Sequence, residues 1–263
     1  MICLILGDTD FPKKILKNFK IKKLKYFIID LSKKNIFKAN QNSFKLNIGQ
    51  FGKMISLMKE KKCKKVLFAG KIIKPDFLSI RMDIKGFFCL PKIIKAAKIG
   101  DAAIIKVIID ILKKEKINVI SSIAFNPELS LKKGNYTKVK PNLKDKKDIK
   151  KGVDYLNRIN AYDYTQGLVV RNRSILRIEN IHGTKKMIQS ITSKLKKAGI
   201  LIKLPKKKQD LRIDLPTIGL DTFKDCKKAG LKGIVMKHKQ NIFLDKEASI
   251  KFANINKIFI KII

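Results

Sequence analysis

The first half of the sequence alternates short apolar runs with segments of helical periodicity, and this alternation limits the folds open to the chain. Each run has the length of a buried strand, and two of them are closed by Gly7 and Gly70. The segment 49–63 carries apolar residues at helical spacing. Repeated strand–helix units form a parallel sheet covered by helices, so we expect residues 1–125 to be a Rossmann-like α/β domain with a mainly parallel sheet. The expected strands are ICLIL (2–6), KYFIID (25–30), KVLFAG (65–70) and INVISS (117–122).

Residues 90–116 follow the pattern of two consecutive helices. Gly100 separates them, and we expect Asp101 to be the N-cap of the second helix. The longest apolar stretch, residues 102–112, is interrupted by a lysine and an aspartate, so it predicts a packed helix rather than a membrane span. The first residues lack the basic segment and the apolar core of a signal peptide. We therefore expect a cytoplasmic protein that meets a membrane only from the side.

The sequence changes character at residue 126. Residues 126–145 are polar, contain two prolines and show no clear period, so we expect them to form a linker. Strand and helix patterns then alternate again, and we expect residues 146–263 to form a C-terminal catalytic domain that is also mixed α/β. The expected elements of this domain are helices at 147–163, 184–199, 221–230 and 245–256, hairpins at 167–180 and 234–245, and strands at 200–205 and 257–263.

The formal net charge of +40 first suggests a polyanionic partner. Only six of the 61 basic residues are Arg, although base readout and bidentate phosphate binding favour Arg. The excess of Lys accompanies an excess of Ile and Asn, as a drift towards AT-rich codons would produce. We favour drift with a solvated surface over a selected polyanion-binding face, and both can hold at an anionic membrane.

Cysteine and histidine do not indicate a metal or nucleophile site. The four cysteines are widely spaced without a C-x-x-C pair, and His182 and His238 are the only histidines. Scattered reduced thiols in a cytosolic protein explain this pattern better than zinc or a Cys/His pair. The G-x-G-x-x-G and P-loop signatures of nucleotide binding are also absent from the sequence.

Glycines, acids and small residues gather at turns of the first domain. Gly7 ends the first strand in LILGDTDFP, and the segments 48–53, 68–77 and 98–103 lie at other strand or helix ends. In α/β sheets the ends of the strands form the ligand crevice, where backbone N–H groups can approach a phosphate. Each segment alone is more typical of an ordinary turn than of a site, but the four together favour a ligand cleft.

Glu179 follows an alternating strand and precedes the sequence HGT, a glycine turn that opens a helix. Such a turn can hold a phosphate on the N–H groups of the helix and on the Thr184 hydroxyl. Two simpler roles stay open, a surface acid at a strand end for Glu179 and an N-cap for Thr184.

Asp214 lies inside the apolar segment RIDLPTIGLDTF, residues 212–223, where a carboxylate is expensive to bury without a partner. Pro216 disfavours a helix through the preceding residue, so we expect Asp214 on extended backbone just before a turn. A capping role is weak because we expect the next helix to begin near Asp221 or Thr222. A Mg²⁺ ligand or a general base is the sharper interpretation, and both stay open.

The chain contains, in this order, the segments IGQFGKM, FAGKIIKPDF, KIGDAAI, QGLVV, IENIHGT and RIDLPTIGLDT. Together they resemble the LpxI family, the UDP-2,3-diacylglucosamine pyrophosphatases of lipid A biosynthesis, over nearly the whole chain. The chain departs from the family at one turn. The family usually has a more glycine-rich turn after the first strand, where this chain has GDTDFP. Asp8 and Asp10 place negative charge where backbone amides would meet a phosphate, and this weakens the prediction for Gly7.

The resemblance implies Mg²⁺-dependent hydrolysis of the pyrophosphate of UDP-2,3-diacylglucosamine, which gives UMP and 2,3-diacylglucosamine 1-phosphate (lipid X). It also implies two domains that close around the substrate, attack of water on the sugar-side phosphorus, and a homodimer. It places the essential, catalytic acid at Asp214. The expected substrate-binding residues are Gly7, Gly70, Lys71, Asp76, Gly100, Asp101, Gln166, Gly167, Glu179, Gly183, Thr184, Arg212, Pro216 and Thr217.

These residue types fit the implied chemistry. A pyrophosphate diester carries two negative charges, so its hydrolysis needs cations and an activated water. Arg212 and Lys203 are the candidate cations, and Asp214 and Glu179 are the candidate Mg²⁺ ligands or bases. A lipid substrate also gives the basic surface a role at the anionic inner membrane, as a peripheral attraction that salt weakens.

Two other hypotheses stay open. The net charge suits a non-enzymatic nucleic-acid-binding protein, which should show clustered Arg and exposed aromatic residues along a basic stripe. The chain has no Trp, five Tyr and few Arg, so we expect no specific nucleic-acid partner. The other hypothesis is a nucleotide-sugar-binding domain without catalysis.

Overall fold

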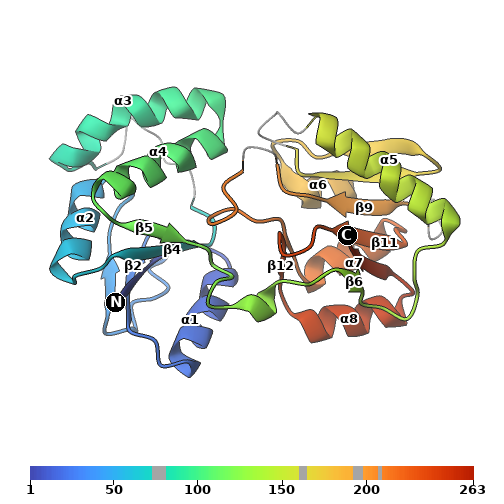
Figure 1. Ribbon diagram of the computed structural model, residues 1–263, viewed down its shortest axis with the longest axis horizontal. Helices are drawn as coiled ribbons and strands as arrows, with labels where there is room; N and C mark the ends of the chain where they lie inside the picture. Colours follow the sequence, from blue (N-terminus) through green and yellow to red (C-terminus); the bar gives the residue numbers. More distant parts are fainter. Residues whose placement is uncertain (73–80, 160–164, 192–197, 207–208) are drawn as a thin grey trace. The chain divides into compact units, whose positions relative to one another are not determined.

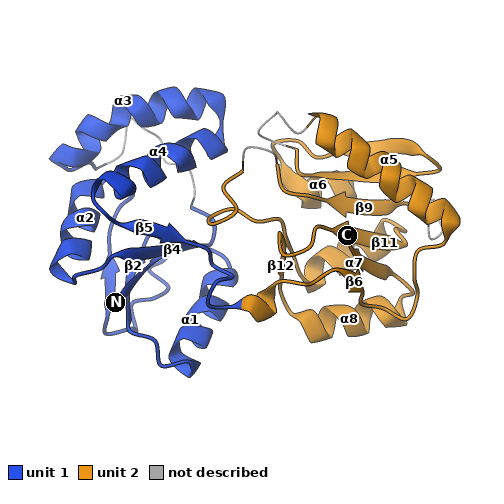
Figure 2. Ribbon diagram, in the orientation of Figure 1, with its two compact units in different colours: residues 1–126 blue, residues 127–263 orange. Residues whose placement is uncertain are grey.

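The chain forms two compact units in the computed structural model, residues 1–126 and residues 127–263 (Figure 2). Each unit combines a sheet with helices, so the predicted fold class of two mixed α/β domains is confirmed (Figure 1). The structure describes residues 1–72, 81–159, 165–191, 198–206 and 209–263.

The sheet of the first unit is parallel, as predicted. Its strands are β1 (Ile2–Leu6), β2 (Tyr26–Asp30), β3 (Ser43–Lys45), β4 (Lys65–Ala69) and β5 (Asn118–Ile120). Within the described residues their order is β3-β2-β1-β4-β5, and every pairing is parallel. The central strands are almost fully buried, which explains their continuous apolar runs. The strand order reverses between β1 and β4, and ligands of α/β sheets commonly bind at such a point.

The helices of the first unit are α1 (Phe11–Ile21), α2 (Phe51–Glu60), α3 (Ile84–Ile99) and α4 (Asp101–Lys114). α2 follows the predicted periodicity and buries its apolar face in the core. The predicted N-cap role of Asp101 is wrong, because Gly100 occupies the N-cap position and Asp101 is the first residue of α4. Gly100 has φ 144°, a backbone conformation that favours glycine, and this break separates α3 from α4.

The second unit contains a mixed sheet. Its strands are β6 (Gly134–Asn135), β7 (Gly167–Arg171), β8 (Ser174–Ile178), β9 (Ile200–Lys203), β11 (Gly233–Met236) and β13 (Phe259–Ile262). In the described part their order is β6-β13-β11-β9-β7-β8. The three strands β13, β11 and β9 run parallel, whereas β6, β7 and β8 join through antiparallel pairings. A separate parallel pair joins β10 (Thr217–Ile218) to β12 (Ile242–Phe243).

Helices cover both faces of this mixed sheet. Alternate residues of β7 and β9 pack either on α5 (Leu143–Ile159) or on the opposite group of helices. That group consists of α6 (Gly183–Gln189), α7 (Leu220–Lys228) and α8 (Lys246–Ile255). The alternation of two apolar faces along each strand therefore builds two cores, one on either side of the sheet.

One predicted hairpin is confirmed and the other is wrong. β7 and β8 pair antiparallel around Asn172 and Arg173, which have φ 48° and 59°. The expected hairpin at 234–245 does not form, because β11 pairs with β9 and β13 while β12 pairs with β10. The helix expected at 184–199 ends at Gln189 in α6, and residues 192–197 lie outside the described residues.

Residues 126–145, expected as a linker, contain a 3₁₀ turn (Pro127–Leu129), β6 and the first residues of α5. β6 adds to the edge of the second sheet through β13. None of the helices in the described ranges combines the length and the apolar character needed to cross a bilayer.

Candidate functional site in the second unit

Two charged side chains are buried together in the second unit. Glu179 directly follows β8 and is 5% exposed, and Lys203 is the last residue of β9 and is 7% exposed. The start of β7 lies between them, because Gly167 pairs with Lys203 in the sheet and its carbonyl accepts the Glu179 N–H at 2.9 Å. The sheet register therefore brings together residues from separate parts of the chain.

The Glu179 carboxylate is held by hydrogen bonds on both oxygens. Thr184 donates its hydroxyl to Oε1 at 2.6 Å, and the Gln166 N–H donates to Oε2 at 3.3 Å. The Thr165 hydroxyl donates to the Glu179 backbone carbonyl at 3.0 Å. A Cβ on Gly167 would lie 2.9 Å from Oε2, closer than real Cβ contacts, so glycine leaves the space that this carboxylate occupies. Glu179 is therefore not a surface acid, and His182 rather than Thr184 occupies the N-cap of α6, so both simpler roles are wrong.

Lys203 is a buried cation next to carboxylates. Its Nζ donates to the Thr217 carbonyl at 3.1 Å. Burial lowers the pKa of Lys203, and the negative charges of Glu179 and Asp214 oppose this effect without cancelling it. The influence of Asp214 on this pKa places the Asp214 carboxylate within electrostatic reach of the buried ammonium group.

Asp214 is partly exposed and lies between a turn and the short strand β10. Its N–H donates to the Asp210 carbonyl at 3.0 Å, so the turn precedes Asp214, whereas the sequence predicted a turn after it. The next helix, α7, has Gly219 at its N-cap. The expectation that Asp214 does not cap the helix that follows it is therefore confirmed.

The other residues predicted around Asp214 have structural partners. Arg212 is exposed, and its guanidinium bonds both carboxylate oxygens of Asp210, at 3.0 and 2.6 Å. This hydrogen bond is the main reason that the pKa of Arg212 is raised and that of Asp210 lowered. Pro216 is buried, and its carbonyl accepts the Ile242 N–H at 2.9 Å.

Gln166 and Gly183 complete the set that surrounds Glu179. The Gln166 side-chain Oε1 is buried and has no hydrogen-bond partner among the described atoms. Gly183 begins α6 with φ 81°, and Glu179 Oε1 is the nearest atom to the position of an added Cβ, at 4.0 Å. The second unit thus gathers Gln166, Gly167, Glu179, Gly183, Thr184, Lys203, Asp214 and the Thr217 carbonyl, which we call the Lys203 cluster.

Three of the residues predicted in the first unit, Gly7, Gly70 and Lys71, lie where the strand order reverses. Gly7 follows β1, and Gly70 and Lys71 follow β4. The Gly7 N–H donates to the Ala69 carbonyl, and Asp8 and Lys71 exchange two backbone hydrogen bonds, all at 2.9 Å. These N–H groups are therefore used within the fold and do not point free towards a phosphate in this structure.

The remaining predictions in the first unit do not join this turn. Gly100 lies at the break between α3 and α4, Asp76 lies outside the described residues, and so does the side chain of Asp101.

Asp83 is a residue that the sequence interpretation missed. Its carboxylate caps α3 through the Gly86 N–H at 2.8 Å and also accepts the N–H groups of Gly52 and Lys53 at the start of α2. Burial raises the pKa of Asp83, but these backbone hydrogen bonds outweigh burial and lower it. An aspartate directly before a mainly apolar segment, in MDIKGFF, was the available signal for a helix start.

Comparison with known proteins decides the family. The model of the LpxI N-terminal domain matches residues 1–129, and the model of the LpxI C-terminal domain matches residues 132–261. The chain belongs to the LpxI family. A protein from Caulobacter vibrioides named UDP-2,3-diacylglucosamine pyrophosphatase LpxI is 33% identical over 223 residues, which cover 82% of this chain and 80% of that protein. The family resemblance seen in the sequence is thereby confirmed.

The Lys203 cluster of this LpxI chain contains few groups that could bind a metal ion. Among the described residues, no three His, Cys, Asp or Glu side chains converge on one point. Mg²⁺ is commonly held by one or two carboxylates together with substrate phosphates and water. Asp214, with a partly exposed side chain, fits that role. Glu179 fits less well, because both its oxygens accept hydrogen bonds and Lys203 would repel a second cation.

Proposed function

We propose that this chain hydrolyses the pyrophosphate bond of UDP-2,3-diacylglucosamine with Mg²⁺, giving UMP and 2,3-diacylglucosamine 1-phosphate in lipid A biosynthesis. The name of the Caulobacter relative and the match of both LpxI domains support the substrate. The observation that carries the proposal is the buried ammonium of Lys203 beside two carboxylates, on the domain that holds the RIDLPTIG segment.

A buried ammonium group suits a substrate with two negative phosphates. In a site with little water, a fixed positive charge stabilises an anion more strongly than it would in bulk solvent. The Thr217 carbonyl already accepts the Nζ–H of Lys203, so the ammonium group is partly held in place before the reaction. Its charge would therefore bind the pyrophosphate and offset the charge that builds up as the bond breaks.

Glu179 would act as a positioning residue for Lys203. It is buried, and Thr184 and the Gln166 N–H fix the direction of its carboxylate. Its negative charge raises the pKa of Lys203 against burial, and so keeps the lysine more fully protonated. This role differs from the metal ligation expected from the sequence, and it explains why both carboxylate oxygens already have donors.

Asp214 would be the residue that takes part directly in the reaction. It is the carboxylate of the cluster with a partly exposed side chain, so a substrate phosphate or a water can reach it. It would either accept a proton from the attacking water or share Mg²⁺ with the substrate, and both roles fit its position. A bound Mg²⁺ would neutralise phosphate charge and lower the pKa of a coordinated water.

The direct test is turnover of UDP-2,3-diacylglucosamine by the purified chain. We expect UMP release with Mg²⁺ and its loss when EDTA is added. In water labelled with ¹⁸O, we expect the label in the phosphate of 2,3-diacylglucosamine 1-phosphate, since the family resemblance implies attack on the sugar-side phosphorus. Release of no UMP would end the proposal, and label in UMP would reverse the assigned site of attack.

The location follows from the substrate. A diacylated sugar nucleotide is held in a membrane by its acyl chains, so we expect the protein to work at the cytoplasmic face of the anionic inner membrane. The net charge of +40 favours such a peripheral association, and salt should weaken it. The homodimer implied by the resemblance is tested by light scattering of the purified chain.

A further inference from the structure

Helix α3 of the first unit exposes large apolar side chains where a globular protein normally exposes polar ones. Ile84, Phe87 and Phe88 are 81%, 63% and 73% exposed. The residues that α3 buries are the small Gly86 and Ala96. The helix therefore packs on its neighbours through small residues and presents its largest residues outward.

These side chains form one continuous patch. Ile84, Phe87, Phe88 and Pro91 are spaced i, i+3, i+4 and i+7, which places them on the same side of the helix. The ring centroids of Phe87 and Phe88 are 6.1 Å apart in a T-shaped arrangement. Two adjacent and mostly exposed Phe rings are rare on a surface that meets only water, and such patches mark interaction sites.

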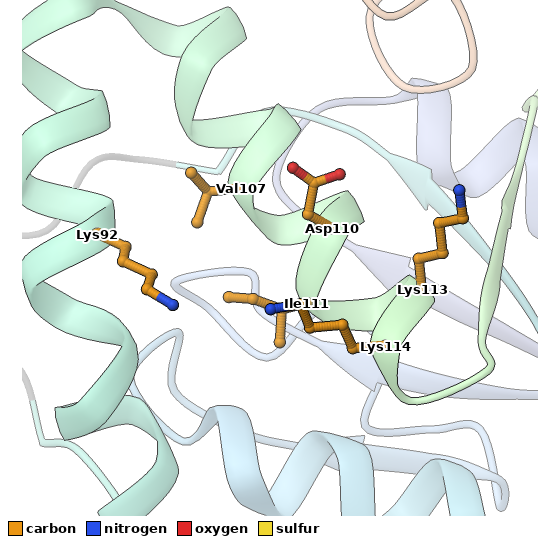
Figure 3. Close-up of a pocket in the computed structure, with 6 residues that line it drawn as sticks. All are labelled: Lys92, Val107, Asp110, Ile111, Lys113 and Lys114. Atoms are coloured by element: carbon orange, nitrogen blue, oxygen red, sulfur yellow. The ribbon is translucent and has the colours of Figure 1, made fainter.

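Three lysines lie on the same side of the helix, towards its C-terminal end. Lys92, Lys95 and Lys98 are exposed on its second half, and α3 contains no acidic residue. The neighbouring Asp83 is occupied by three backbone N–H groups. Lys92 also lines a groove of about 480 Å³, together with Val107, Asp110, Ile111, Lys113 and Lys114 of α4 (Figure 3). Three ammonium groups and one carboxylate give this groove a positive charge.

We propose that α3 docks this protein on an anionic lipid surface, with Phe87 and Phe88 inserted among the headgroups and the lysines on lipid phosphates. A lipid surface provides an apolar layer for the exposed apolar side chains of α3 and a negatively charged layer for its lysines. Amphipathic helices that bind a membrane lie in the interface with their apolar face buried roughly 5–10 Å deep. The proposal concerns binding alone and does not rest on the hydrolase activity.

Charge argues against a second copy of the chain as the occupant. A symmetric contact through α3 would bring the lysines of one copy against the lysines of the other, and like charges at an interface are unfavourable. A protein partner would need an acidic rim around an apolar groove. Lipid phosphates supply the negative charge without any such shape requirement.

The absence of tryptophan from the sequence makes insertion measurable. Phe88→Trp places one reporter on α3, and Ile255→Trp, at a position 70% exposed on α8, is the matched control. The probe is vesicles of phosphatidylglycerol and phosphatidylethanolamine with brominated acyl chains. We expect a blue shift and quenching on vesicle binding for Phe88→Trp and neither for Ile255→Trp.

Two outcomes of this measurement would overturn the proposal. If the chain binds vesicles but the emission of Phe88→Trp stays that of a water-exposed indole, another surface makes the contact. If the emission is already blue-shifted without vesicles and does not change on adding them, protein covers α3, either the second unit or another copy of the chain.

Charge reversal distinguishes vesicle binding through α3 from the general attraction of a basic protein to anionic lipid. Lys92→Glu with Lys95→Glu should lower the vesicle partition coefficient at least roughly tenfold, since each lysine near the surface contributes to binding. Lys150→Glu with Lys151→Glu makes the same change of net charge on exposed positions of α5 and should lower it much less. Equal losses from both pairs would contradict the proposal, provided that circular dichroism shows all variants folded.

The apolar contribution is tested at high salt, where charge attraction is screened. Phe87→Ser with Phe88→Ser should abolish the residual vesicle binding that wild type retains there. Unchanged binding by this variant would show that the aromatic patch does not insert. Because the two Phe side chains are exposed, the variant should keep the melting temperature of wild type.

Discussion

The two units differ in the one feature of each that the stability of the fold does not explain. The first unit uses the polar groups at its strand and helix ends within the fold, as Asp8 with Lys71 and Asp83 with three N–H groups illustrate. It leaves large apolar residues exposed on α3. The second unit buries the charges of Glu179 and Lys203.

Neither the buried charges nor the exposed apolar residues stabilise the fold. A charge taken out of water must be compensated by partners, and an exposed aromatic patch gains nothing from burial. We therefore propose different tasks for the two units, with binding and cleavage of an anion by the second and docking on lipid by α3 of the first. Changes to the two kinds of feature should have different effects.

The largest expected effect on stability comes from removing the charge of Glu179. Glu179→Gln would leave the buried ammonium of Lys203 with less compensation, and we expect the free energy of unfolding to fall by about 3 kcal/mol. Urea denaturation of the wild type and the variant measures this difference. The double variant Glu179→Gln with Lys203→Met should be more stable than Glu179→Gln alone, and strictly additive losses would show that the two charges do not interact.

The lowered pKa of Lys203 also predicts a pH dependence. Between the folded pKa and the unfolded value of about 10.4, the unfolded chain binds more protons at this residue, so the free energy of unfolding rises with pH. Below the folded pKa the penalty for burying the charge is complete. Lys203→Met should lack this rise, and identical pH profiles for the two proteins would contradict a lowered pKa.

A smaller effect is expected at Thr184. Thr184→Val keeps the shape of the side chain but removes the hydroxyl that bonds Glu179, and we expect a loss of about 1–2 kcal/mol together with slower turnover. Thr184→Ser keeps the hydroxyl and should stay close to wild type in both measurements. Equal behaviour of Val and Ser would mean that this hydrogen bond does not position the carboxylate.

The smallest effect is expected in the first unit. Asp83→Ala removes the cap shared by α2 and α3 and should lower stability by about 1 kcal/mol, while the rate of UMP release stays unchanged. The stabilisation should be present above about pH 4 and be lost as the pH falls through the lowered pKa of Asp83. A loss of turnover without a loss of stability would indicate that residues of the first unit take part in the reaction.

Much of the fold could be predicted from local patterns. The apolar runs, two of them closed by a glycine, identified β1, β2, β4 and β5, because buried parallel strands need continuous apolar residues. The hairpin expected at 234–245 failed because two apolar segments around a polar turn do not specify their partners. Packing with residues distant in sequence decides that β11 joins β9 and that β12 joins β10.

The site was less accessible to sequence reasoning. Glu179, Thr184 and Asp214 were proposed from local patterns, but only the register of β7 with β9 puts Lys203 beside Glu179. Arg212 was expected to face the substrate, yet its partner is Asp210, two residues away. The hydrogen bonds of the turns at Gly7 and Gly70 form because β1 and β4 end side by side, and neither segment alone indicates this pairing.

The most direct test of the Lys203 cluster as the reaction site compares two acids of one turn. Asp214→Asn removes the carboxylate assigned to the chemistry, and Asp210→Asn removes one that bonds Arg212 at the surface. In UMP-release assays with Mg²⁺, we expect Asp214→Asn to lose at least roughly 10²-fold in rate and Asp210→Asn to stay within severalfold of wild type. A fully active, folded Asp214→Asn variant would contradict the account.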